Sequence, residues 1–130
     1  MTMACLALAG CGGSAERDRP PEPPGAVVRE FLAAKRAVDG KRMCALYSAA
    51  YREQLRQDPD NEPRLSCERL AVSYARAYRE EDNGLRRVEV AGDSAVATVS
   101  CEDPSASDCS LALVKEDGRW RIAGGLSPND

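Results

Sequence analysis

The sequence predicts an α+β fold in which about three helices precede a curved antiparallel sheet of about four strands. In the first two thirds of the chain, apolar residues recur at three- and four-residue spacing, the period of a helix with one buried face. After Asn83-Gly84 the pattern changes to alternation, and β-branched residues become frequent. A chain of 130 residues supports one core, which we expect to span residues 25–126, with a tail at 127–130.

The first predicted helix follows Pro23-Pro24, because proline is tolerated in the first turn of a helix. Gly40 is expected to end this helix in the left-handed conformation that glycine adopts readily. The apolar face of the helix consists of Val27, Val28, Phe31, Leu32, Ala34 and Val38.

The second helix is predicted from Arg42 to about Gln54 with a break at Ser48, and the turn residues at 58–63 end it. The third is predicted from about Pro63 to Arg79. Their buried stripes are expected to hold Met43, Leu46, Tyr47 and Ala50 in the second helix, and Cys67, Leu70, Ala71, Tyr74 and Tyr78 in the third.

Two hairpins follow, because Gly92-Asp93 and Asp117-Gly118 are turn dipeptides between alternating runs. Alternation predicts that one face of the sheet is buried and that Trp120 belongs to the core. The four predicted strands are Leu85–Ala91, Ala95–Cys101, Cys109–Lys115 and Arg119–Ala123.

The N-terminus carries an export signal in our interpretation. Leu8-Ala9-Gly10-Cys11 directly follows a short apolar run and resembles the lipobox of bacterial lipoproteins, so residues 1–10 are expected to be removed and Cys11 to be lipidated. The run is too short to span a bilayer. Export signals begin with positive charges, and only Met1-Thr2 precedes the run here, which indicates a true start further upstream.

A tether and a location follow from this interpretation. Residues 11–24 are rich in proline, glycine and charge, a composition that forms an extended linker and not a core. The expected location is the cell envelope, with the lipid on Cys11 anchoring the protein to the outer face of the cytoplasmic membrane.

Four cysteines remain once the signal is removed and Cys11 is lipidated, an even number that suits an oxidising compartment. Four cysteines allow three pairings. Cys101 and Cys109 flank a turn-rich stretch between two predicted strands, which favours their pairing and leaves Cys44 with Cys67. A zinc site is disfavoured because the spacing lacks Cys-x2-Cys pairs and the chain has no histidine. No metal or other cofactor is expected.

The order of several short segments resembles a known family. The segments are residues 28–34, residues 40–48 with their cysteine, the second cysteine in the third helix, and the hairpin 114–122 with Asp-Gly and Trp. Together they resemble the NTF2-like (nuclear transport factor 2) fold and the small actinobacterial lipoproteins built on it. The resemblance implies a cone with a pocket lined by the concave face of the sheet. The family includes isomerases, cyclases, carriers and binding modules, so the resemblance by itself does not select one function.

Candidate ligand-binding residues in such a pocket are Tyr47, Tyr74 and Tyr78, with core packing as the competing interpretation. Isomerase chemistry needs a carboxylate base near a tyrosine donor, and no Asp or Glu falls on an apolar stripe. The absence of histidine removes Ser-His and Cys-His nucleophiles, so no catalytic residue is assigned. A net charge of −3 with both signs interspersed disfavours nucleic acid as a partner.

The leading functional hypothesis is a non-enzymatic lipoprotein whose domain binds a protein partner or a small apolar ligand. One alternative is an enzyme resembling ketosteroid isomerases and polyketide cyclases. Another is a structural component of the envelope, for which pairing of two copies is expected.

Overall fold

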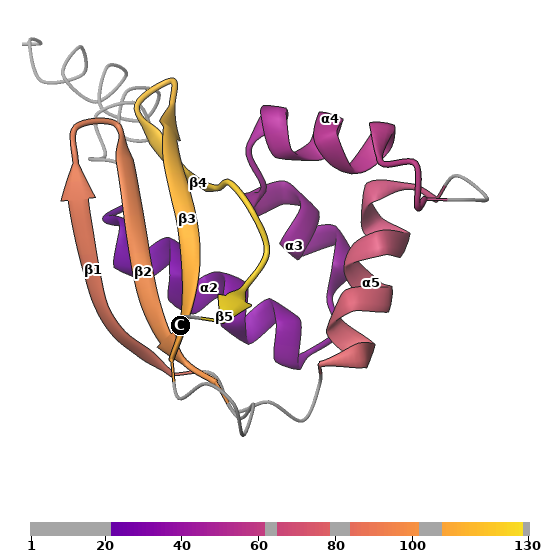
Figure 1. The fold of residues 1–130 in the computed structure, drawn as a ribbon, viewed down its shortest axis with the longest axis horizontal. Coiled ribbons are helices and arrows are strands. Elements are labelled where there is room, and N and C mark those ends of the chain that lie inside the picture. The colour runs from indigo at the N-terminus through magenta and orange to yellow at the C-terminus, as the bar shows by residue number, and fades with distance from the viewer. Residues whose placement is uncertain (1–21, 62–64, 79–83, 102–107, 129–130) are drawn as a thin grey trace, which may run out of the picture.

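The computed structural model describes residues 22–61, 65–78, 84–101 and 108–128, in which helices precede an antiparallel sheet (Figure 1). The α+β class is therefore confirmed. The elements are α2 (Pro24–Arg36), α3 (Gly40–Leu46), α4 (Ala49–Gln57), α5 (Cys67–Ala77), β1 (Leu85–Ala91), β2 (Ser94–Ser100), β3 (Asp108–Glu116), β4 (Arg119–Ile122) and β5 (Ser127–Pro128).

Helix α2 begins at Pro24 and buries Val28, Phe31 and the rest of its apolar face, as the spacing predicts. Its end differs from the prediction. The helix stops at Arg36, and Val38, not Gly40, takes the left-handed conformation, with φ of 54°. Gly40 instead opens α3, so its assignment as a cap of the first helix was wrong.

The second predicted helix is divided at Ser48, as expected. The Ser48 hydroxyl accepts a hydrogen bond from the Tyr51 amide and thereby caps α4. The Ser48 amide donates to the Ile122 carbonyl at 2.7 Å, which ties the break to the sheet. Ala50 was predicted to be buried, but it is exposed. It belongs to α4, a helix in which no residue is buried.

Helix α5 begins at Cys67, several residues later than predicted. The Ser66 hydroxyl accepts a hydrogen bond from the Arg69 amide at 3.2 Å and caps this end. Upstream, the buried Asn61 side chain accepts from the Leu65 amide at 3.0 Å and donates to the Leu55 carbonyl at 3.4 Å. These side-chain bonds take the place of helical bonds in this connection.

The sheet has the order β1-β2-β3-β4, with every neighbouring pair antiparallel, and β5 pairs with β3. Both predicted hairpins are present, and the left-handed conformations of Gly92, Asp117 and Gly118 supply their turns. The two-residue strand β5 lies within the stretch expected to be a tail.

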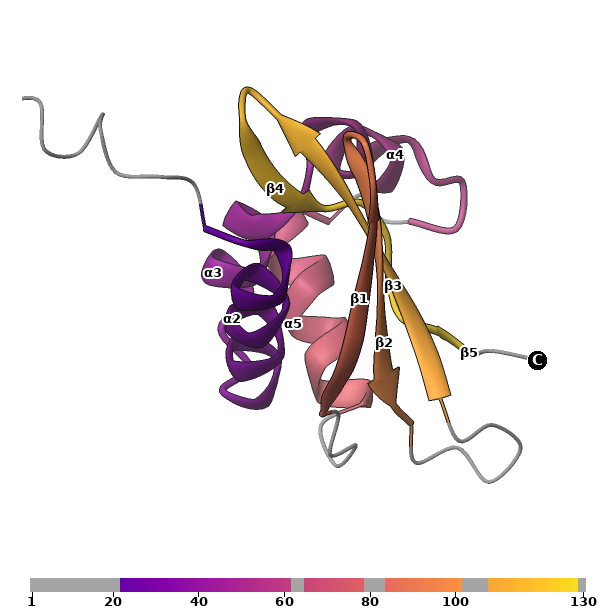
Figure 2. The same cartoon turned by 90° about the vertical axis from the view of Figure 1, so that its left-hand side faces the viewer.

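The helices α2, α3 and α5 lie on one side of the sheet (Figure 2). Helix α2 contacts β1, β2 and β4 as well as α3 and α5. Trp120 is buried, as predicted, and the Lys115 ammonium lies 5.6 Å from its ring centroid. The largest apolar side chains that are fully buried are Phe31, Met43, Leu111, Leu113 and Ile122.

Candidate functional site

Tyr47, a predicted ligand residue, belongs to the core. Its side chain is 4% exposed, and its ring lies 5.9 Å from Phe31 and 4.9 Å from Tyr51. The segment around it forms a parallel bridge with Ile122 of β4, which holds the ring against the sheet. Burial raises the pKa of Tyr47, and the neighbouring Tyr51 and Tyr74 raise that pKa further. Tyr47 is therefore a neutral packing residue at physiological pH.

The other two predicted ligand residues lie on α5 and at its C-terminal end. Tyr74 is half-buried, and its ring lies 5.0 Å from that of Tyr78, which is 46% exposed. Tyr74 is close enough to Tyr47 to influence its ionisation, whereas Tyr78 caps the exposed end of the helix.

The buried polar side chains of the described part of the chain include no carboxylate. They are Lys35, Ser48, Asn61 and Thr98. Burial raises the pKa of Tyr51, and Asp58 raises it further, but Asp58 itself is exposed at the end of α4. The same residues contain no group of three His, Cys, Asp or Glu side chains able to hold a metal ion.

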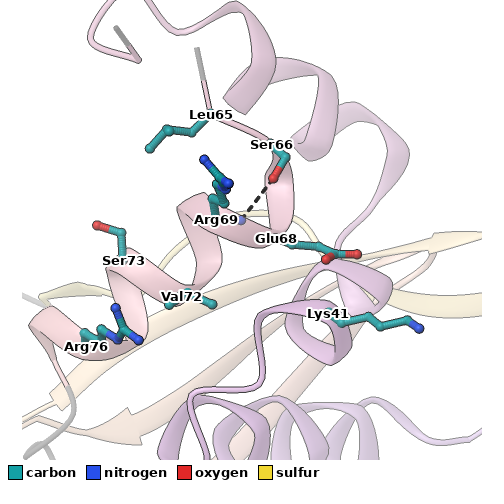
Figure 3. A pocket seen from close by; sticks show the side chains of 8 residues that line it. All are labelled: Lys41, Leu65, Ser66, Glu68, Arg69, Val72, Ser73 and Arg76. Atoms are coloured by element: carbon teal, nitrogen blue, oxygen red, sulfur yellow. Dashed lines mark hydrogen bonds between the residues drawn. The ribbon is translucent and has the colours of Figure 1, made fainter. Parts of the chain in front are cut away.

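A groove of about 580 Å³ lies on the outer surface of α5 (Figure 3). Three cations, one carboxylate, two hydroxyls and two apolar side chains form its walls. Lys41 comes from α3, and the other groups come from α5 and the two residues before it. The lining residues are Lys41, Leu65, Ser66, Glu68, Arg69, Val72, Ser73 and Arg76.

The spacing along α5 explains how the groove is built. Arg69, Ser73 and Arg76 follow one another at four and three residues, so they lie on neighbouring turns of one helix face. In Figure 3, Arg76 lies at one end of the groove and Glu68 with Lys41 at the other. Arg69 and Arg76 lie outside the buried stripe that the sequence predicts for this helix. The spacing of the two arginines in the sequence indicates that they share a helix face. The contribution of Lys41 could not be predicted, because it depends on the packing of α3 against α5.

Two disulfides link the four cysteines in the predicted pairs. Cys44–Cys67 joins α3 to α5, with 5.9 Å between the Cα atoms, and Cys101–Cys109 joins the end of β2 to β3, with 5.6 Å. Cys11, the predicted lipidation site, lies outside the described residues, as do residues 1–10 and most of the expected linker.

One buried charge escaped the sequence interpretation. The Lys35 side chain is 1% exposed, and its ammonium donates a hydrogen bond to the Tyr78 carbonyl at 2.9 Å. A cation at a helix C-terminus is favourable, so Lys35 stabilises the end of α5. The sequence does indicate this burial, because Lys35 lies seven residues after Val28 and therefore on the buried face of α2.

Within the described residues, no helix has the length and apolar character needed to cross a bilayer. No protein-family model matches the chain, and no curated protein matches it.

Proposed function

We propose that the protein is an exported lipoprotein, anchored through Cys11, whose domain binds an acidic segment of a partner protein in the groove on α5. The observation that carries the export part is the pairing of all four cysteines of the expected mature domain. Such pairing is typical of oxidising compartments and rare in the cytosol.

The domain is assigned to the NTF2-like fold as part of this proposal. Support comes from the order of elements, helices followed by an antiparallel meander, and from α2 packed on one face of the sheet. In the described residues, large side chains such as Phe31, Met43 and Leu111 are fully buried, and the groove on α5 lies outside this core. A ligand is therefore expected on the outer surface of the domain.

The chemistry of the groove favours an acidic peptide. Lys41, Arg69 and Arg76 supply three positive charges against one negative charge from Glu68. Arginine offers several N–H donors in a planar fork that suits a carboxylate. Leu65 and Val72 add apolar contact between the charges. The chain as a whole has a net charge of −3, whereas the groove is positively charged. This contrast suits recognition of an acidic segment by the groove.

The anchoring part is tested by metabolic labelling with a fatty acid in a bacterial host. Wild-type protein is expected to incorporate label and to sediment with membranes, and the Cys11→Ala variant is expected to do neither. Equal labelling of the two proteins would contradict lipidation.

The binding part is tested with a glutamate-rich peptide titrated into the detergent-solubilised full chain, followed by fluorescence anisotropy. The double variant Arg69→Glu/Arg76→Glu is expected to bind at least about tenfold more weakly, because two charge-assisted contacts become repulsive. The control Arg52→Glu/Arg119→Glu changes the net charge equally at exposed positions outside the groove. Equal weakening in both variants would assign the binding to overall charge and refute the groove.

A further inference from the structure

The outer edge of β1 has no pairing strand among the described residues. Strand β1 is the first in the sheet order, and only β2 pairs with it (Figure 1). Such an edge presents backbone N–H and C=O groups that can pair with another strand. Proteins often block edges of this kind with charged residues and bulges, and β1 has both, since its register shifts between Leu85 and Arg87. The arrangement of the charges decides whether they block pairing or direct it.

The charges of β1 are complementary to those of a second copy in one register. Arg87 and Glu89 lie on the same face of the strand, with the Arg87 Nε 3.3 Å from a Glu89 carboxylate oxygen, and their side chains are 69% and 73% exposed. Antiparallel pairing of two β1 strands centred on Val88 places Arg87 directly opposite Glu89 of the partner subunit. By symmetry, Glu89 then lies opposite Arg87 of the partner subunit. Opposite charges in facing positions stabilise a strand pair.

Other registers are disfavoured by the same residues. Centring the pair on Arg87 places two arginines opposite each other, and centring it on Glu89 places two carboxylates opposite each other. Facing like charges destabilise a strand pair. Arg86 does not add to the repulsion, because its guanidinium pairs with Asp108 of β3 at 2.9 Å. The charge pattern therefore favours the alignment centred on Val88 over the two neighbouring alignments.

Apolar contact supports the same alignment. Val88 pairs with Ala97, which is fully buried, so Val88 points towards the helix side of the sheet, where it is half-buried. In the alignment centred on Val88, the two Val88 side chains face each other. Val90, on the same side of the strand and 56% exposed, would also gain cover from the partner subunit.

We propose that the protein forms a homodimer in which two β1 strands pair antiparallel about Val88 and extend the sheet across both copies. The two-fold axis of such a pair is perpendicular to the sheet, so the helices of both copies lie on the same side. At the start of α2, Gly25 lies close to Leu85 and Val88, with 3.5 and 3.8 Å from its Cβ position to their side chains. The first residues of the two α2 helices therefore lie near the axis and on one face.

This geometry suits two chains attached to one membrane, although the strand pairing itself does not depend on lipidation. Five residues from each copy bury less surface than a standard stable interface, so pairing in solution is expected to be weak, with a Kd of about 10–500 µM. Confinement of both copies to one surface raises their effective concentration and favours the dimer.

The test is a charge exchange, measured by analytical ultracentrifugation of the full chain carrying Cys11→Ser. No lipid can attach to this chain, so the result is independent of anchoring. Arg87→Glu alone and Glu89→Arg alone are each expected to raise the dimer Kd at least about tenfold. The double variant Arg87→Glu/Glu89→Arg restores complementarity and is expected to dimerise like the parent.

Mixing the two single variants provides the sharpest outcome. One copy then carries two carboxylates and the other two arginines, so the mixture is expected to form a heterodimer that neither variant forms alone. Arg52→Glu, an exposed change on α4, is the control and should dimerise normally. A parent chain that stays monomeric up to 1 mM would overturn the proposal. So would a dimer indifferent to both single variants but broken by Val96→Glu, which would assign pairing to the outer sheet face, where Val96 is exposed.

Discussion

Gly40 illustrates how a single residue determines the packing of two helices. An ideal Cβ at this position would lie 2.4 Å from the Glu68 carbonyl oxygen and 2.6 Å from a Val72 methyl carbon. The first of these atoms is backbone and cannot rotate away. Glycine is therefore required here because α3 and α5 approach closely, and not for its backbone freedom.

Gly40→Ala is expected to destabilise the protein by about 1–3 kcal/mol, because the extra methyl forces α3 and α5 apart. Chemical denaturation measures the change in the free energy of unfolding. Gly124→Ala is the matched control, since its Cβ would meet no atom within 4 Å. Equal stability of Gly40→Ala and the parent would show that the helices are further apart than described.

The buried phenol of Tyr47 predicts a loss of stability in alkali. Burial raises the pKa of Tyr47, so the folded state keeps a proton that the unfolded state releases near pH 10. The stabilisation is complete below pH 10, and above it the free energy of unfolding falls by at most about 1.4 kcal/mol per pH unit for this group. Melting temperatures measured from pH 8 to 11.5 are expected to fall less steeply in Tyr47→Phe. The half-exposed Tyr78→Phe serves as the control, and identical slopes in all three proteins would contradict the assignment.

Among the elements, α4 is attached through its first turn as well as through Tyr51 and Leu55, which are partly buried against the core. None of its residues is fully buried, yet the Glu116 carboxylate accepts the Ala49 amide at 3.0 and 3.2 Å, and Ser48 caps the same end. A negative charge at a helix N-terminus is favourable. The β3–β4 hairpin therefore anchors α4 through one side chain.

Glu116→Gln is expected to weaken this anchor by about 0.5–1 kcal/mol, because the charge is lost while an acceptor oxygen remains. Hydrogen exchange of the Ala49 amide should accelerate about two- to fivefold. Glu22→Gln removes an equivalent charge at an exposed position outside this contact. Unchanged exchange at Ala49 would mean that Ser48 alone holds the turn.

The sequence predicted the elements better than their ends. Local signals, such as the Asp117-Gly118 turn and the break at Ser48, depend on neighbouring residues and were interpreted correctly. The late start of α5 comes from local side-chain bonds of Asn61 and Ser66, which the helical periodicity does not record. The position of Gly40 depends on the contact between α3 and α5, which are distant in sequence. The groove was missed for the same reason, because Lys41 joins it only through packing of α3 on α5.

At the scale of the whole molecule, two disulfides link the helices and the sheet separately. Cys44–Cys67 lies within the helical half and Cys101–Cys109 within the sheet, with sequence separations of 23 and 8 residues. The longer loop restricts the unfolded chain more strongly. The two halves therefore differ in how much stability they gain from covalent closure.

Replacing both cysteines of the longer loop, in Cys44→Ser/Cys67→Ser, is expected to cost about 3.5 kcal/mol. The corresponding pair Cys101→Ser/Cys109→Ser should cost about 2.5 kcal/mol. Urea denaturation of the two variants measures the difference directly. A greater loss from the shorter loop would show that contacts in the sheet, and not closure of the unfolded chain, dominate the effect.

The close approach at Gly40 also has a consequence for biogenesis. Cys44 lies one turn further along α3, so docking of α3 against α5 brings its thiol to Cys67. Cys101 and Cys109 are near in sequence and can oxidise while the polypeptide is still largely unstructured. We therefore expect the Cys101–Cys109 bond to form first and to remove two competing thiols, so that Cys44 and Cys67 then have only each other as partners within the domain.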